Sequence, residues 1–492
     1  MLGLRNRLTL PAATVGTGAS AGAFLAVAGS QASPMMAALA LVGMLIAGFV
    51  FASPILGFLL TAFVVPLERI GRLTNDSAAT TVSLMRIVGT LSLVALLFQR
   101  LVRRKDLWLP TPVWLYSGYF VFLLMSVVKQ PSLREGIRGT TSMLANVMFI
   151  VLTVNAVRNR RHVKLAIAAW LASTALIGVF TIYQYHMDAA VTEDQRAATG
   201  MRTTEERFST VLHDSAEYEV LGNSIKRAIG STSNAAVYGI NLILTLPFLF
   251  WALHEAKSTL AAIGILTIAA VVMYNTLLTN TRAVVATMAV CVILSLLFGV
   301  LRIKPKVWFG LGCAALAVIP FIPSEIYERA LAPSNYTVEK SASLRYRFLY
   351  WETAVGIISE NFWFGVGAGN QTIIPETIKN VHMPPNASAH NEYLNSLMEV
   401  GIFGYLMLGA FLVSAWRRFR SGAKRFARLG DNEGVLLMRA IMVNFLCVLC
   451  FAVQVDVLHF PLKGWWLALG LGVALERMSR VEWTAAVQGR VE

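Results

Sequence analysis

The chain has 492 residues, of which 56% are hydrophobic and only 14% are charged, and its formal net charge is +15. A soluble domain carries about 25% charged residues, so this composition excludes an ordinary soluble protein. The apolar residues gather in blocks of roughly 17 to 25, the length that a helix needs to cross about 30 Å of hydrocarbon. We therefore predict an all-α fold, a polytopic bundle of transmembrane helices in a lipid bilayer.

The predicted spans follow one another along the chain, with a long gap before the last three. In chain order they are 36–66, 83–99, 113–129, 140–157, 163–185, 235–254, 260–279, 284–301, 307–322, 398–416, 438–456 and 462–478. The first block is too long for one straight span, and Ser53-Pro54 could divide it. If it forms two short helices and 12–30 also spans, the twelve spans become fourteen.

Lysine and arginine gather on one side of these spans. With the N-terminus inside, the inside segments hold basic clusters at 103–105, 158–161 and 417–439, whereas the acidic residues concentrate outside. The excess of positive charge in inside segments predicts a multi-pass protein with both termini in the cytoplasm. The same bias explains the net charge, so we predict no nucleic-acid partner.

Two long segments are predicted to face outside, 186–234 and 323–397. They divide the chain into three parts. Residues 1–322 hold the N-terminal spans and the loop at 186–234. Residues 323–397 form a large extracytoplasmic loop that is expected to contain short helices and the catalytic motifs. Residues 398–492 hold the C-terminal spans and a cytoplasmic tail.

The most informative segment is SAHNEYLNSLMEVGIFGY, residues 388–405. It places His390, Asn391 and Glu392 where the large loop meets an apolar helix. A neutral imidazole there could take a proton from a hydroxyl, with the amide or the carboxylate orienting its ring. The alternative is a histidine that merely tolerates the interface. The spacing is not that of an H-E-x-x-H zinc site, and the four cysteines lie inside apolar spans, so we predict no metal.

Two further features of the polar segments suggest anion binding. Arg282 lies between two spans joined by almost no loop, where it is either a snorkelling anchor or a clamp whose guanidinium forks onto a lipid phosphate. A predicted amphipathic helix from Arg345 to about Asn361 precedes FWFGVGAGN. Because this G-x-G-x-G follows a helix and not a strand, it is not a dinucleotide-binding fingerprint. It forms either a tight turn at the membrane surface or a nest of N–H groups near a phosphate or sugar.

The segment AHNEYLNSLMEVGIFGY resembles the signature of the O-antigen ligase and polysaccharide polymerase family. In that family His-Asn-x-Tyr/Phe-Leu is followed by a helix with Glu-x-Gly-x-x-Gly, here Glu399, Gly401 and Gly404. Three other segments agree in order: KRAIGSTSNAAVYGINLILTLPF, TNTRA, and RFLYWETAVGIISENFWFGVGAGN. The first lacks a proline often found before its asparagine, and TNTRA has local variants at 280 and 281. Together they cover 226–415, within a similar layout of nine helices, a long loop and three helices.

The resemblance implies a metal-independent, inverting glycosyltransferase that needs no cofactor. Its donor would be a glycan on undecaprenyl diphosphate, presented at the outer face of the cytoplasmic (inner) membrane, so that the active site faces the periplasm. His390 would activate the acceptor hydroxyl, and Arg282 and Arg347 would bind the diphosphate. Arg227 is a further candidate for binding the diphosphate. Either Arg345 or Arg347 would point into the site. Asn391, Glu392 and Tyr393 would support His390.

Two activities of this class stay open. A polymerase adds the growing chain to an acceptor glycan on another lipid-linked repeat unit, whereas a ligase moves the finished chain onto lipid A-core. We favour a polymerase of surface polysaccharide or exopolysaccharide, for which a flippase and a chain-length regulator are implied partners. A polysaccharide or lipid transporter is a less favoured alternative, because it would be expected to show repeats and several midplane charges. Arg86 and Glu399 lie within predicted spans, and Lys129 lies at the edge of one. The last alternative is a polyprenol-type transferase with Glu68 or Asp76 as its base.

Overall fold

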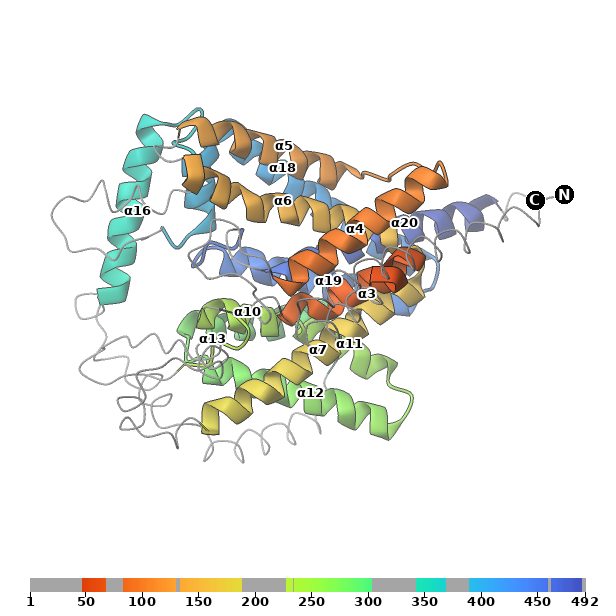
Figure 1. The fold of residues 1–492 in the computed structure, drawn as a ribbon. Coiled ribbons are helices and arrows are strands. Elements are labelled where there is room, and N and C mark those ends of the chain that lie inside the picture. The colour runs from red at the N-terminus through yellow and green to blue at the C-terminus, as the bar shows by residue number, and fades with distance from the viewer. Residues whose placement is uncertain are drawn as a thin grey trace, which may run out of the picture.

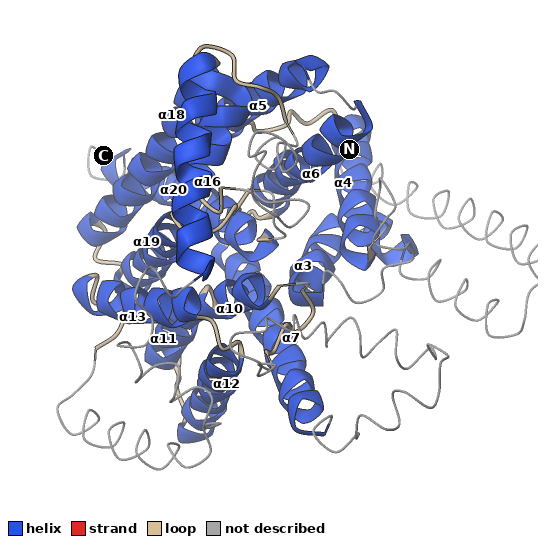
Figure 2. Ribbon diagram, turned by 90° about the vertical axis from the view of Figure 1, so that its left-hand side faces the viewer, coloured by secondary structure: helices blue, strands red, loops and turns tan. Residues whose placement is uncertain are grey.

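A computed structural model of the chain describes residues 47–67, 83–129, 133–187, 227–232, 234–302, 342–368, 389–458 and 462–488. Within these ranges the elements are α-helices and short 3-10 turns, and no strand occurs (Figure 2). The all-α prediction is therefore confirmed for the described residues. The predicted spans at 12–30 and 307–322, and most of the loop at 186–234, lie outside them.

The helices keep the labels of Figure 1. They are α3 (Pro54–Val64), α4 (Leu84–Val102), α5 (Thr111–Ser126), α6 (Leu133–Ala156), α7 (Arg160–Met187), α10 (Ala235–Ile243), α11 (Leu246–Glu255), α12 (Thr259–Leu278), α13 (Arg282–Leu297), α16 (Ala342–Glu360), α18 (Glu392–Arg428), α19 (Asn432–Phe451) and α20 (Lys463–Gln488). The 3-10 turns η1 (Val65–Leu67) and η2 (Val127–Lys129) extend α3 and α5.

Seven stretches of the described residues are long and apolar enough to cross a membrane: Leu84–Val102, Thr111–Lys129, Arg160–His186, Ala235–Glu255, Thr259–Leu278, Glu392–Arg428 and Asn432–Phe451. Shorter apolar helices occupy Pro54–Leu67, Met143–Ala156 and Arg282–Leu297. The chain is thus a multi-pass helical membrane protein, as its composition predicts. Whether it crosses twelve or fourteen times stays a prediction.

Two prolines mark helix starts inside apolar blocks. Residues 47–52 are helical, the chain leaves the helix at Ser53, and α3 begins at Pro54. The predicted division at Ser53-Pro54 is therefore confirmed. The span predicted at 235–254 is built from two helices, α10 and α11, with Pro247 in the first turn of α11. Proline fits a first turn because its missing N–H would have no helical partner there.

The helix predicted at 398–416 is longer in both directions. α18 runs for 37 residues, from Glu392 to Arg428, and Gly401 interrupts it with φ 64° and ψ −172°. The first half of residues 417–437, the basic stretch between two predicted spans, is helical. The helix continues there because a buried apolar stripe continues at helical spacing, and its members include Leu408, Phe411, Ala415, Phe419 and Phe426.

The core of the bundle surrounds the first half of α20, which is almost fully buried. Tyr116 of α5, Phe411 of α18 and Trp466 of α20 meet there, with the Tyr116 ring centroid 4.6 Å from that of Trp466 and 5.1 Å from that of Phe411. α16 lies across the left-hand end of the bundle in Figure 1, roughly perpendicular to the long helices. Since α16 runs from Ala342 to Glu360, the helix predicted from Arg345 to about Asn361 is confirmed, and it covers one end of the bundle.

Candidate active site

His390 lies in the turn that leads into α18. The side-chain oxygen of Asn391 caps this helix by accepting hydrogen bonds from the backbone N–H groups of Tyr393 at 3.0 Å and Leu394 at 3.3 Å. His390 just before the cap has a left-handed backbone, with φ 47°. This conformation is uncommon for a residue with a β-carbon and costs about 1 kcal/mol or more. The surrounding contacts therefore hold the histidine in a backbone conformation that it would not choose alone.

α16 supplies those contacts. The Tyr350 ring centroid lies 6.3 Å from that of the His390 imidazole, and the indole N–H of Trp351 donates a hydrogen bond of 2.8 Å to the carbonyl oxygen of Ala389. Arg347 lies one turn earlier on the same helix, close enough for its charge to act on His390. The structure thus brings together His390 and Arg347, two of the predicted site residues that come from distant parts of the chain.

The surroundings of His390 keep its imidazole neutral. Burial, and to a smaller extent the positive charge of Arg347, together lower the pKa of His390 from its ordinary 6.5 to about 4. At neutral pH the ring therefore carries no charge and has a nitrogen that can accept a proton. A neutral base beside a fixed guanidinium can deprotonate one group while it stabilises negative charge on another.

Two other predicted cations lie at the corner between α12 and α13. Arg282 is the first residue of α13 and is exposed. The chain turns sharply before it, because Asn280 has φ 45°. Arg227 is partly buried, and the backbone N–H of the next residue, Ala228, donates to the carbonyl oxygen of Leu278 at 2.9 Å. The segment that carries Arg227 is therefore attached to the end of α12, beside the corner that carries Arg282.

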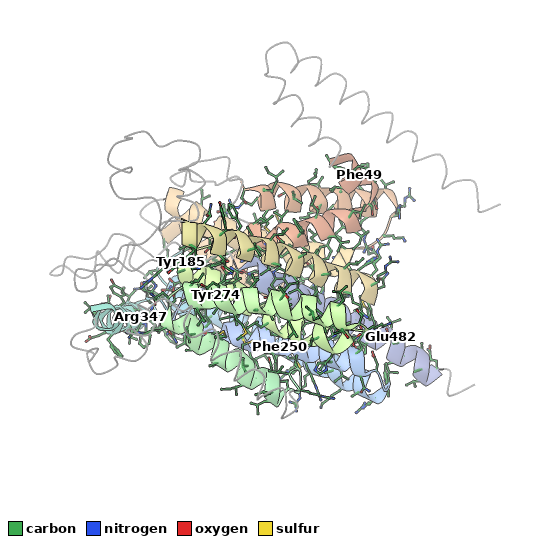
Figure 3. The ribbon with its side chains drawn as sticks, turned by 90° about the horizontal axis from the view of Figure 1, so that it is seen from below. Phe49, Tyr185, Phe250, Tyr274, Arg347 and Glu482 are labelled. Atoms are coloured by element: carbon green, nitrogen blue, oxygen red, sulfur yellow. The ribbon has the colours of Figure 1, made fainter. Side chains whose placement is uncertain are left out.

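These elements share one end of the bundle. The beginning of α16 lies toward α10 and α13 in two views at right angles (Figures 1 and 2). Figure 3 shows Arg347 at this end, with Tyr185 and Tyr274 on the same side and Glu482 at the other end. The side chain of Arg345 lies outside the described residues, so Arg347 is preferred because its charge acts on His390.

The predicted supporting residues anchor the start of α18 to its neighbours. Glu392 is buried, and its carboxylate accepts hydrogen bonds from the Ser396 hydroxyl at 2.6 Å and the backbone N–H of Leu458 at 2.8 Å. The Tyr393 hydroxyl donates to the carbonyl oxygen of Leu449 at 2.7 Å. These bonds connect α18 to α19 and to the segment before α20. They position the His390 turn from the side opposite α16.

The glycine turn after α16 docks onto the break in α18. The N–H groups of Val366 and Gly367 donate to the carbonyl oxygens of Met398 and Glu399, at 2.8 Å and 3.1 Å, and the N–H of Ile402 donates to Phe362 at 2.8 Å. The N–H groups of Val366 and Gly367 already donate to carbonyl oxygens of α18, so they are not available to bind an anion. The structure therefore favours the tight turn over an anion nest. The last two residues of the motif, at 369 and 370, lie outside the described residues.

The close backbone contact between the turn and α18 requires glycine at two positions, Gly365 and Gly401. A β-carbon on Gly365 would lie 2.5 Å from the carbonyl group of Glu399, and one on Gly401 would lie 2.5 Å from the carbonyl group of Trp363. Both glycines also have positive φ, 63° and 64°. The docking fixes the far end of α16 on α18, and it thereby fixes Arg347 relative to His390.

Sequence reasoning assigned no role to two lysines near this end. The Lys129 ammonium donates a hydrogen bond of 2.9 Å to the carbonyl oxygen of Gly365 and lies 5.5 Å from the Phe364 ring centroid. Lys463, the first residue of α20, is buried and donates to the side-chain oxygen of Asn146. The available signal was the cost of a cation inside or beside an apolar block, which implies a specific partner.

Fold and site together define a multi-pass helical membrane protein with a neutral histidine and a guanidinium held together at one end of its bundle. The sequence model of the O-antigen ligase family matches residues 267–409, which include the second part of α12, all of α13 and α16, and the His390 turn. This match confirms the resemblance to the O-antigen ligase and polysaccharide polymerase family over that segment. Arg227 lies outside it.

A relative agrees with the family match. The chain is 23% identical over 385 residues to the teichuronic acid biosynthesis protein TuaE of Bacillus subtilis (strain 168), an alignment that covers 74% of this chain and 71% of that protein. The similarity thus extends well beyond the segment that the family model matches.

Proposed function

We propose that the protein is an integral-membrane glycosyltransferase that extends a polysaccharide. It moves a glycan from undecaprenyl diphosphate to an acceptor hydroxyl at the outer face of the cytoplasmic membrane. The observation that carries this proposal is the pairing of Arg347 with a neutral His390, which α16 and α18 hold together. The family match over residues 267–409 supports the class of reaction.

His390 is the proposed general base. Its imidazole takes the proton of the acceptor hydroxyl while that oxygen attacks the anomeric carbon of the donor sugar. The bond between the anomeric carbon and the diphosphate oxygen breaks as the new glycosidic bond forms on the opposite face, so the configuration inverts. The pKa of about 4 keeps the imidazole in its basic form at neutral pH.

The arginines are proposed to stabilise the leaving diphosphate. Negative charge accumulates on its oxygens as the sugar departs, and a planar guanidinium can bind two of them at once. Arg347 is the first candidate because it lies beside His390. Arg282 and Arg227 are further candidates because they lie at the α12–α13 corner, at the same end of the bundle. Fixed cations in this place make a metal ion unnecessary for the charge that develops.

Transfer of a finished chain to lipid A-core is the second candidate function. The description of the matching family names a ligase, which favours it. The name of the relative, a protein of teichuronic acid biosynthesis, favours the assembly of a polymer. We place the polymerase first because the similarity to this relative covers 74% of the chain, whereas the family model matches only residues 267–409.

Deletion of the gene separates the two activities. If the protein is a polymerase, single repeat units accumulate on undecaprenyl diphosphate and long chains disappear. If it is a ligase, full-length chains accumulate on that lipid and the lipid A-core stays bare. Glycans of normal length on their normal acceptors would contradict both proposals.

The His390→Ala variant tests the chemistry directly. We expect transfer to fall by about a hundredfold to ten-thousandfold, the usual contribution of a general base. The matched control is His186→Ala, because His186 lies at the same end of the bundle and bonds to the Tyr274 hydroxyl at 2.9 Å. Both variants should reach wild-type amounts in the membrane. Full transfer by correctly folded His390→Ala would refute the proposed role of His390.

A further inference from the structure

A second candidate site lies at the opposite end of the bundle from α16. A cavity of about 570 Å³ opens between the end of α4, the α6–α7 junction and the second half of α20. Figure 3 shows Glu482, which lines this cavity, far from Arg347. The charged side chains that line it are Arg100, Lys105, Arg158, Arg160, Arg477 and Glu482. Five cations therefore face a space that holds one carboxylate.

The carboxylate of Glu482 already has an ion-pair partner among the cations of the cavity. Glu482 and Asp431 both pair with Arg160. Within the described part of the chain, none of the other four cations has a carboxylate at ion-pair distance. These four cations therefore gather around the cavity without a protein anion to neutralise them.

Arg100 shows the resulting repulsion. Its guanidinium donates hydrogen bonds to the backbone carbonyl oxygens of Asp106 at 3.0 Å and Asn155 at 3.2 Å, while the charges of Arg158 and Arg477 act against it. Its Nε is buried and has no hydrogen-bond partner among the described residues. Clustered cations that repel one another are stabilised when a shared anion lies among them.

The walls of the cavity indicate where that anion comes from. Val481, which lines the cavity, is 63% exposed, and Leu101, next to the lining residue Arg100, is 78% exposed, as expected of apolar side chains that face lipid. The Arg477 guanidinium lies 4.8 Å from the Trp108 ring centroid. Tryptophan and arginine together are typical of the level where hydrocarbon gives way to headgroups. The cavity is therefore at headgroup depth, on the end that the charge bias predicts to be cytoplasmic.

We propose that this cavity binds the phosphate headgroup of an anionic phospholipid from the cytoplasmic leaflet. The guanidinium groups of Arg158 and Arg477 bind the phosphate oxygens, and the lipid chains lie along the exposed apolar side chains of α4 and α20. Basic pockets between transmembrane helices on the cytoplasmic side suit such headgroups. A soluble phosphate would use the same charges but would gain nothing from the apolar wall. This site is separate from the proposed glycosyl transfer at the α16 end.

A double variant with a charge-matched control tests the proposal. Arg158→Gln with Arg477→Gln removes two cavity charges, and Arg420→Gln with Lys424→Gln removes two exposed charges of α18 that do not line the cavity. Phosphatidylglycerol is added to each purified protein in a neutral detergent, and bound lipid is counted by native mass spectrometry. We expect the cavity variant to bind it about thirtyfold more weakly, because each cation near an anionic lipid contributes about a factor of five. The control should bind like the wild type.

Three outcomes would overturn the proposal. If the two double variants lose binding equally, the effect is that of net charge and not of the cavity. If phosphatidylcholine binds as tightly as phosphatidylglycerol, the cavity does not select an anionic headgroup. If inorganic pyrophosphate raises the melting temperature of the wild type as much as phosphatidylglycerol does, and only in proteins with an intact cavity, the anion is soluble and the lipid assignment is wrong.

Discussion

The two ends of the bundle use arginine in opposite ways. At the end opposite α16, the buried carboxylate of Glu476 accepts hydrogen bonds from Arg418 at 2.9 Å, Arg425 at 2.7 Å and Arg480 at 2.9 Å. At the α16 end, Arg347 acts on a histidine that burial keeps neutral. The first arrangement neutralises charge and connects α18 to α20. The second places a cation beside a base, so it is suited to chemistry.

This contrast teaches that the number of arginines does not locate a site. The basic end has more arginines, and the positive-inside bias already explains them. What distinguishes the α16 end is that the charge of Arg347 acts on a buried, neutral imidazole, whereas the arginines at the other end pair with a carboxylate. The following predictions test whether charge at one end serves stability and charge at the other serves transfer.

The largest effect on stability is expected for Glu476→Gln. Removing the buried carboxylate leaves three guanidinium groups without their shared anion, which should cost about 3 kcal/mol of unfolding free energy. The measurement is the melting temperature in detergent. Glu433→Gln is the control, since Glu433 forms a partly exposed pair with Lys164 and should change stability by less than about 1 kcal/mol. Equal losses in the two variants would remove the structural distinction.

The reverse pattern is expected for Arg347→Gln. Loss of a guanidinium that stabilises the leaving group should lower transfer about a hundredfold or more. The melting temperature should change little, because Arg347 lies on the partly exposed face of α16. Arg420→Gln removes an exposed arginine of α18 and should leave transfer unchanged. If Arg347→Gln lost stability and activity in proportion, Arg347 would be a structural residue.

Gly401→Ala tests how firmly the two helices of the site are held together. The new β-carbon would lie 2.5 Å from the Trp363 carbonyl group at a φ of 64°, so we expect a loss of about 2 kcal/mol and reduced transfer. Gly409→Ala is the control on the same helix, because a β-carbon there meets nothing within 4 Å. Its melting temperature should stay the same or rise. A Gly401→Ala variant as stable as Gly409→Ala would show that the docking is loose.

The smallest effect is expected in the pH dependence of transfer. A lowered pKa means that the base is lost only as the pH falls through about 4. An ordinary histidine would be only about one-tenth neutral at pH 5.5. Initial rates should therefore stay near their maximum at this pH, and Arg347→Gln should move the acidic limb upward. The same shift makes folding less favourable as the pH falls from 6.5 toward 4, because the unfolded chain binds the proton first. If the initial rate of the wild type fell to half its maximum near pH 6.5, the burial of His390 would be contradicted.

The apolar runs predicted the membrane helices well. The predicted spans 83–99, 163–185 and 260–279 correspond to α4, α7 and α12 within a few residues, because a long apolar run in a membrane protein has one stable backbone form. The break in α18 could not be predicted. The run around Gly401 is apolar except for Glu399 and predicts a continuous helix, whereas the backbone that forces the break, at Trp363 and Phe364, comes from another segment.

The candidate site could be predicted in its residues but not in its geometry. The His390 turn stood out as a polar island, and the resemblance implied Arg282 and Arg347, with Arg345 as a competitor of Arg347. Nothing in the sequence indicated that Tyr350 and Trp351 would hold the His390 turn, or that the imidazole would be neutral, because burial arises only when α16 covers the bundle end. The buried Lys463 was missed for the same reason, since its partner Asn146 lies on another helix.

The straight part of α18 after the break at Gly401 sets the angular relation between the two ends of the molecule. The part before the break begins at the cap next to His390, and the part after it carries Arg418 and Arg425 near its finish. A single-residue deletion in the straight part after Gly401 would turn everything beyond it by about 100° and shorten the helix by about 1.5 Å. Either the arginines would then leave Glu476 or the His390 turn would leave α16. The length of this segment is therefore constrained even where its individual side chains only face lipid.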